Sequence, residues 1–128
     1  MEIRVPLSVG ELIDKLTILD IKAGRIADAS KRANVVREQT MLRETVAREV
    51  PASAELDALT ADLKSVNEAL WTIEDEIRDL ERARDFGARF VELARAVYIT
   101  NDRRAALKKD INLLVGSDIV EEKSYQPY

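Results

Sequence analysis

The feature that most constrains the fold is an unbroken row of aliphatic side chains in the middle of the chain, spaced alternately three and four residues apart. The row consists of Leu56, Leu59, Leu63, Val66, Leu70, Ile73, Ile77 and Leu80. This spacing places every member on one side of an α-helix, as in the hydrophobic seam of a coiled coil or of a long bundle helix. The row therefore predicts a helix over 54–84, about 45 Å long at 1.5 Å per residue.

Two shorter helices are predicted before this row. Ser8 followed three residues later by Glu11 forms a capping box, which predicts a helix over 9–27. A second helix is expected over 31–49, and Pro51 ends it. Because its apolar stripe is thin, we expect this second helix on the outside of the bundle.

The last helix is expected over 86–115. Its apolar stripe includes Arg104 at a position where an aliphatic residue would fit, and Asn101 and Asp102 interrupt its apolar character. We expect one continuous helix that bends or carries a polar layer at these residues. Gly116 follows it and is a good helix terminator.

These segments together predict an all-α fold, an antiparallel helical bundle of about four helices with a long, coiled-coil-like third helix. The length favours a single helical-bundle domain over residues 1–128. Residues 1–7 alternate apolar and polar side chains around Pro6, which indicates an edge strand or an extended arm. Residues 117–128 form a C-terminal tail that pairs with this arm or lies along the bundle.

The composition excludes several classes of chemistry. The chain has no Cys and no His, so thiolate or imidazole zinc ligands and Ser-His or Cys-His dyads are absent. Chemistry would have to come from carboxylates, Lys, Arg, Tyr, Ser, Thr or a metal bound by oxygen ligands. We identify no catalytic residue, no metal ligand and no cofactor, and expect a protein that is not an enzyme.

The charge and hydropathy of the chain limit the classes of partner that it can bind. The net charge of −4 and the interleaving of acidic with basic residues argue against nucleic-acid binding. No apolar run is long enough for a membrane span or a signal peptide. We therefore expect a soluble, cytoplasmic protein.

The predicted third helix carries a polar and aromatic stripe beside its seam. Asn67, Trp71, Glu74 and Arg78 follow one another at spacings of four, three and four residues. A lone Trp beside a carboxylate and a guanidinium is one way to line a small binding pocket. The alternative is a boundary stripe in which Trp71 packs against a neighbouring helix and Glu74 pairs with Arg78.

A second polar group lies on the last helix, near its expected buried seam. Buried polar groups need partners, so we expect a Tyr98–Asp102 hydrogen bond or a network between Arg95 and a carboxylate. This network either fixes the register of the helices or meets the stripe of the third helix in a polar pocket. The candidate pocket consists of Asn67, Trp71, Glu74, Arg78, Arg95, Tyr98, Asn101 and Asp102.

Two acidic pairs offer a magnesium site as an alternative. Glu76 and Asp79 lie three residues apart, and Glu11 and Asp14 repeat that spacing on the first helix. Carboxylates on facing helices can bind divalent ions, and the pattern resembles the magnesium site of all-α nucleotide pyrophosphohydrolases. The exposed position predicted for Glu76 and Asp79, with arginines nearby, favours a salt-bridged helix surface instead.

Several stretches resemble a family of short, helical bacterial proteins to which no activity is assigned. They are SVGELIDKLTILDIKAGRI (8–26), VNEALWTIEDEIR (66–78), FVELARAVYITNDRRAALKKDIN (90–112) and VEEKSY (120–125), about half of the chain. The resemblance implies one helical domain. It also implies a glycosyltransferase-related or sugar-related context, because that domain can accompany such proteins.

These observations favour a non-catalytic helical interaction or scaffold module, accessory to sugar or glycan metabolism. A long seam tends to be completed by a partner, so we expect a homodimer or another protein partner. Two alternatives stay open: a small magnesium-dependent enzyme acting on a nucleotide or sugar-nucleotide, and a small-molecule binding protein with its pocket around Trp71.

Overall fold

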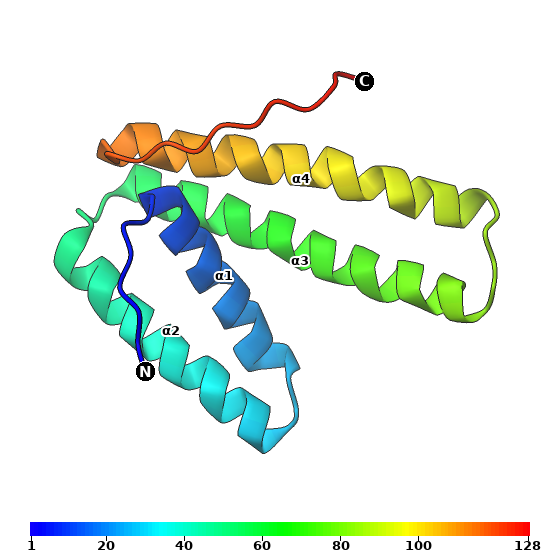
Figure 1. Cartoon of the computed structure of the whole chain (residues 1–128), viewed down its shortest axis with the longest axis horizontal. Coiled ribbons are helices and arrows are strands. Elements are labelled where there is room, and N and C mark those ends of the chain that lie inside the picture. Colours follow the sequence, from blue (N-terminus) through cyan, green and yellow to red (C-terminus); the bar gives the residue numbers. More distant parts are fainter.

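The computed structural model describes all of residues 1–128 and consists of four α-helices without strands. The helices are α1 (Val9–Arg25), α2 (Ala29–Glu49), α3 (Ala54–Arg82) and α4 (Ala88–Val115). They form two antiparallel hairpins, α1–α2 and α3–α4, with α1 lying across one end of the longer α3–α4 hairpin (Figure 1). The all-α prediction with a long third helix is confirmed.

Ser8 and Gly116 mark the ends of their helices as predicted, and Asp28 caps a third terminus that was not predicted. The Ser8 hydroxyl accepts a hydrogen bond from the backbone N–H of Glu11 at 3.1 Å, which confirms the predicted start of α1. The Asp28 carboxylate accepts one from the N–H of Lys31 at 2.8 Å, so α2 begins at residue 29, two residues before its predicted start. At the end of α4, Gly116 adopts the left-handed conformation with φ of 67°.

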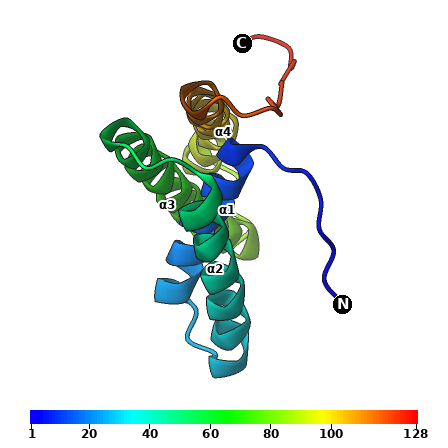
Figure 2. The same ribbon diagram turned by 90° about the vertical axis from the view of Figure 1, so that its left-hand side faces the viewer.

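The second helix packs along α1, and its backbone does not come close to α3 or α4. Gln39 is its one buried residue, and only Val46 and the adjacent Val50 reach the hydrophobic core. Figure 2 shows the α1–α2 hairpin projecting from the α3–α4 hairpin. The predicted position of this helix on the outside of the fold is confirmed.

The hydrophobic core lies where α1 crosses the α3–α4 hairpin. Its central cluster consists of Ile13, Leu56, Leu63 and Ile111, and the last two are completely buried. We call residues 54–67 of α3 and 101–115 of α4 the inner half of the hairpin, and residues 72–100 the outer half. No other helix covers the outer half (Figure 1).

The aliphatic row of α3 is buried unevenly as a result. Leu56, Leu63 and Val66 are buried in the inner half, whereas the members from Leu70 to Leu80 are only half-buried. In the outer half the row faces α4 alone, because α1 has already diverged from the hairpin (Figure 1).

The two ends of the chain are extended and do not pair. Residues 1–7 are exposed and stand clear of the helices (Figure 2), and no backbone hydrogen bond joins them to the tail. The tail runs back along α4, which is the second of its two predicted arrangements (Figure 1). Helix α4 is continuous through Asn101 and Asp102, as predicted. None of the four helices combines the length and apolar character that crossing a membrane requires.

Helix α1 approaches α4 most closely at Gly10. Its backbone N–H donates to the Asn112 side-chain oxygen at 2.6 Å, and a Cβ atom at this position would collide with the Lys108 backbone carbonyl. A residue without a side chain is therefore required there for steric reasons alone.

We predict that Gly10→Ala destabilises the fold by about 1–3 kcal/mol, because α1 must move away from α4 to accommodate one methyl group. Gly24→Ala is the matched control within the same helix, since a Cβ at Gly24 would have no neighbour within 4 Å. This control should gain about 0.5–1 kcal/mol from helix propensity. Urea unfolding followed by circular dichroism measures both changes, and equal effects at the two positions would contradict the close approach.

Candidate functional site

A completely buried carboxylate, Asp14 of α1, holds three helices together. Its Oδ1 accepts hydrogen bonds from Arg104 Nε of α4 and from Asn67 Nδ2 of α3, each at 2.9 Å. Its Oδ2 accepts from an Arg104 terminal nitrogen at 2.5 Å. A buried charge is tolerated only when it is paired and hydrogen-bonded, and the two-pronged guanidinium supplies both conditions.

The hydrogen bonds to Asp14 raise the pKa of the Arg104 guanidinium above its ordinary value, although burial acts in the opposite direction. The arginine therefore stays charged at any pH at which the protein is studied.

The same network fixes the side-chain amide of Asn67. Its Nδ2 also donates to Thr17 Oγ1 at 2.9 Å, and that hydroxyl in turn donates to the Asp14 backbone carbonyl at 2.8 Å. Because Nδ2 points at two acceptors, Oδ1 must point the other way. This oxygen accepts no hydrogen bond from the chain.

Further polar contacts continue along the α1–α4 contact. Lys108 Nζ lies 2.5 Å from Glu11 Oε2 and 3.7 Å from Glu121 of the tail. Arg104, Lys108 and Asn112 are four residues apart, so they form one line of α4 that faces α1. The Ser8 hydroxyl donates to Glu121 at 2.7 Å, which ties the tail to the start of α1.

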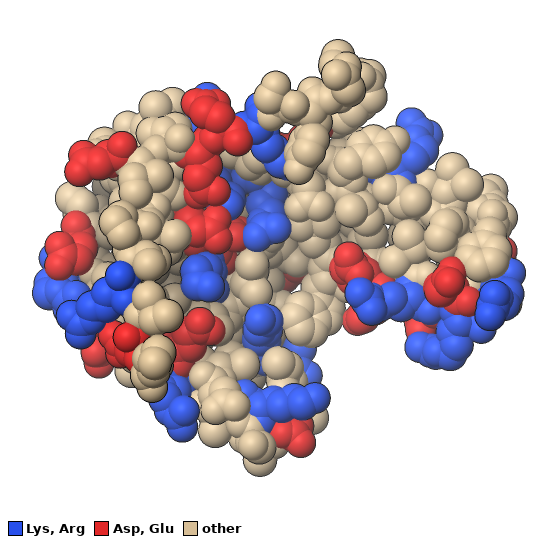
Figure 3. All heavy atoms as spheres, in the orientation of Figure 1, with Lys and Arg blue, Asp and Glu red and all other residues tan.

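The predicted pocket residues of α3 line a cleft between α1 and the α3–α4 hairpin. This cleft, here called the Trp71 cleft, has a volume of about 460 Å³, within the range of small-molecule sites. It is lined by Ile18, Ile21, Asn67, Leu70, Trp71, Glu74, Asp75, Arg78, Asn101 and Arg104. Figure 3 shows a recess between the α1–α2 hairpin and the outer half of the α3–α4 hairpin.

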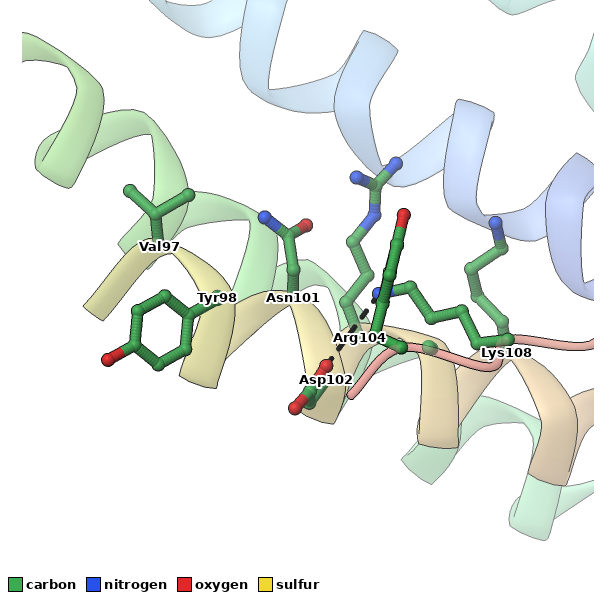
Figure 4. Close-up of a pocket in the computed structure, with 9 residues that line it drawn as sticks. Val97, Tyr98, Asn101, Asp102, Arg104 and Lys108 are labelled. Carbon is green, nitrogen blue, oxygen red and sulfur yellow. Dashed lines mark ion pairs between the residues drawn. The ribbon is translucent and has the colours of Figure 1, made fainter. Parts of the chain in front are cut away.

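The remaining predicted residues are not part of this cleft. Figure 4 shows Asn101 and Arg104 pointing toward α1, whereas Tyr98 and Asp102 point to the other side of α4. There they line a second pocket of about 560 Å³, to which Asn101 and Arg104 also contribute and which the tail residues Lys123 and Tyr125 help to form. The predicted residues are therefore divided between two pockets that share Asn101 and Arg104, and Arg95 lines neither pocket.

Neither of the expected polar networks of the last helix is present. Asp102 accepts a hydrogen bond from the Tyr128 hydroxyl at 2.8 Å and does not bond to Tyr98, whose ring packs on the Tyr128 ring. The hydrogen bond to Asp102 raises the pKa of Tyr128. Arg95 is exposed and forms no ion pair. The physical reason is that these side chains lie on the surface of α4, where the tail supplies the partners.

The environment of Trp71 has features of both a binding pocket and a boundary stripe. The ring is half-buried, and the Arg25 guanidinium lies over it at 5.7 Å from the ring centre. Glu74 and Arg78 form an exposed ion pair at 3.0 Å, as the boundary-stripe interpretation predicts. Trp71 nevertheless also lines a cleft.

The two acidic pairs do not converge. Glu76 bonds to Arg89 at 2.5 Å and Asp79 bonds to Arg82 at 3.0 Å, both in the outer half. Glu11 and Asp14 lie on α1 beside the inner half, where each is paired with a basic residue of α4. The structure contains no group of three or more Asp or Glu side chains arranged to hold a metal ion.

Sequence reasoning missed the buried Thr17 and Asn112, considered Asp14 only as a member of an acidic pair, and placed Arg104 at an apolar position of the last helix. A signal for them existed. Arg104, Lys108 and Asn112 recur at one helical spacing on the side of α4 that should face another helix. Gly10, Asp14 and Thr17 do the same on α1.

Comparison with known proteins assigns neither a family nor a function to this chain. No protein-family model matches the chain, and neither a curated protein nor a solved structure shows significant similarity to it. The resemblance to a family of helical bacterial proteins stays a prediction.

We predict that Arg104→Met lowers the free energy of unfolding by about 3–5 kcal/mol, because Asp14 would be left buried without its cation. Arg78→Met is the matched control, since it breaks the exposed ion pair with Glu74 and should change stability by no more than about 1 kcal/mol. Chemical denaturation of both variants at neutral pH measures the difference. A loss of less than about 1 kcal/mol in Arg104→Met would show that the buried pair is not essential.

Proposed function

We propose that the protein is a non-catalytic helical interaction module that forms a homodimer through the outer half of α4. The observation that carries the proposal is an uncharged stripe left open on this part of the helix. Val91 and Tyr98 are 53% and 44% exposed, although they are large apolar or aromatic residues. Contiguous apolar surface of this kind typically marks an interaction site.

The stripe follows the helical repeat. It consists of Phe86, Phe90, Val91, Ala94, Val97 and Tyr98. These positions lie within about one-third of the helix circumference at 3.6 residues per turn. Phe86, just before α4, extends the stripe and packs edge-on against Phe90 at 5.1 Å. The stripe has no charged member, which distinguishes it from the rest of the outer half.

A second copy of the chain is the occupant that fits this stripe. In a twofold dimer, a residue of one copy contacts its partner reciprocally. If two α4 helices cross antiparallel near Ala94, Val91 of each copy lies against Tyr98 of the other. The small side chain of Ala94 allows the helices to approach closely at the crossing point.

Dimerisation also explains the uneven burial of the α3 row. A hairpin of two helices cannot enclose its own seam, and in the inner half α1 supplies the missing layer. Two outer halves packed together make a four-helix arrangement of the kind that encloses such seams. The exposed Arg95 at the edge of the stripe is available to pair with a carboxylate of the second copy.

The proposal also includes a cellular location and a metabolic context. We assign the module to the cytoplasm and to an accessory role in sugar or glycan metabolism. The accessory role is supported by the resemblance alone.

We predict that Val91→Arg converts the dimer into a monomer, because two cations would meet two apolar surfaces across the twofold axis. Leu113→Arg is the matched control, since Leu113 lies on the same helix, is 65% exposed and is far from the stripe. Size-exclusion chromatography with light scattering over a wide concentration range measures the mass of each variant.

Circular dichroism should show equal helix content in both variants, because neither position contributes to the buried core. A wild-type protein that is monomeric at all concentrations would refute the proposal. A Val91→Arg variant that dimerises as strongly as Leu113→Arg would refute the assigned surface.

A further inference from the structure

Asn67, which lines the Trp71 cleft, has a side-chain oxygen that accepts no hydrogen bond from the chain. Asn67 is only 6% exposed, and its Nδ2 is held by Asp14 and Thr17. Every side-chain nitrogen or oxygen that is fully enclosed in this protein has a hydrogen-bond partner. Asn67 Oδ1 has none, so it must be reached from outside, and Asn67 lines the Trp71 cleft. A fixed acceptor among the lining residues of a cleft is available for an N–H donor of a ligand.

Two further polar groups of the cleft are free. Arg104 uses Nε and one terminal nitrogen for Asp14, and its second terminal nitrogen makes no hydrogen bond. The Asn101 amide forms no hydrogen bond within the chain and points to the same side of α4 as Arg104 (Figure 4). The cleft therefore presents one acceptor, from Asn67, and donors from the two α4 residues.

The other walls suit a flat, uncharged molecule. Trp71 lines the cleft with the Arg25 guanidinium over its ring at 5.7 Å, and Ile18, Ile21 and Leu70 complete an apolar surface. Two carboxylates, Glu74 and Asp75, and two guanidiniums, Arg78 and Arg104, line the cleft, so they give no net charge that would select an ion.

We propose that the Trp71 cleft binds a neutral planar heterocycle with an amide-type edge, such as a nucleobase. The ring stacks on Trp71, its N–H donates to Asn67 Oδ1, and the neighbouring carbonyl accepts from Arg104 or Asn101. An edge with an adjacent donor and acceptor matches these groups, whereas a hydrocarbon ring leaves Asn67 Oδ1 desolvated without a partner. The proposal is independent of the dimer, because the cleft and the α4 stripe share no residue.

The single tryptophan of the chain provides the test. Uridine and guanosine, which carry an N–H beside a carbonyl, should quench Trp71 fluorescence saturably. The probe 3-methyluridine has the same ring but a methyl group in place of the N–H, so its binding should be at least about tenfold weaker, since a buried acceptor then loses its donor. Benzoate, an aromatic anion without the amide edge, is the second control and should not bind.

The variant Asn101→Ala should weaken uridine binding about three- to tenfold, which is the contribution of one hydrogen bond between uncharged groups. Its thermal unfolding should match the wild type, because Asn101 has no partner to lose. Glu68→Ala, an exposed neighbour of Asn67 outside the cleft, should bind as the wild type does.

Two results would overturn the proposal. No saturable quenching by uridine or guanosine at millimolar concentration would show that the cleft takes no such ring. Equal quenching by uridine and 3-methyluridine would show stacking on Trp71 without recognition of the amide edge.

Discussion

The hydrogen-bonded ion pair between Asp14 and Arg104 is the interaction on which the arrangement of the helices depends. The Asp14 carboxylate is bonded at once to α3, through Asn67, and to α4, through Arg104. The apolar cluster beside it has only four buried members, and apolar packing is not directional, so it provides little information on the orientation of α1. Hydrogen bonds are directional, and three of them at one carboxylate define where α1 crosses the α3–α4 hairpin.

The position of this crossing explains both functional surfaces. Because α1 is fixed at the inner half through Gly10, Asp14 and Thr17, its C-terminal part diverges from the hairpin (Figure 1). The Trp71 cleft forms where the helices separate. Beyond that point α1 covers nothing, and the outer half of α4 keeps its apolar stripe exposed. The cleft and the proposed dimer surface therefore have a common structural origin.

The sequence was sufficient to predict the helices, because their signals are local. The spacing of the row from Leu56 to Leu80 predicts a helix wherever that helix packs in the fold. The Ser8 cap of α1 likewise depends only on residues close in sequence. The candidate pocket was harder to predict, because adjacent residues on a helix point in directions about 100° apart. Asn101 and Asp102 point to different sides of α4 (Figure 4), and only Asn101 reaches the Trp71 cleft. The spacing of polar residues in the sequence shows which face of a helix is polar. Only the packing of the helices shows which neighbouring helix that face contacts.

Stability alone does not account for the polar contact between α1 and α4. Replacing a buried ion pair with well-packed apolar residues is often neutral or stabilising, so the pair must contribute something other than stability. An apolar face of α1 could slide or rotate on the hairpin with little cost, whereas Asp14 has its partners in one register only. That register holds Asn67 Nδ2 toward Asp14 and Thr17, and so leaves Oδ1 without a partner in the chain. We infer that the network serves to position this acceptor of the Trp71 cleft.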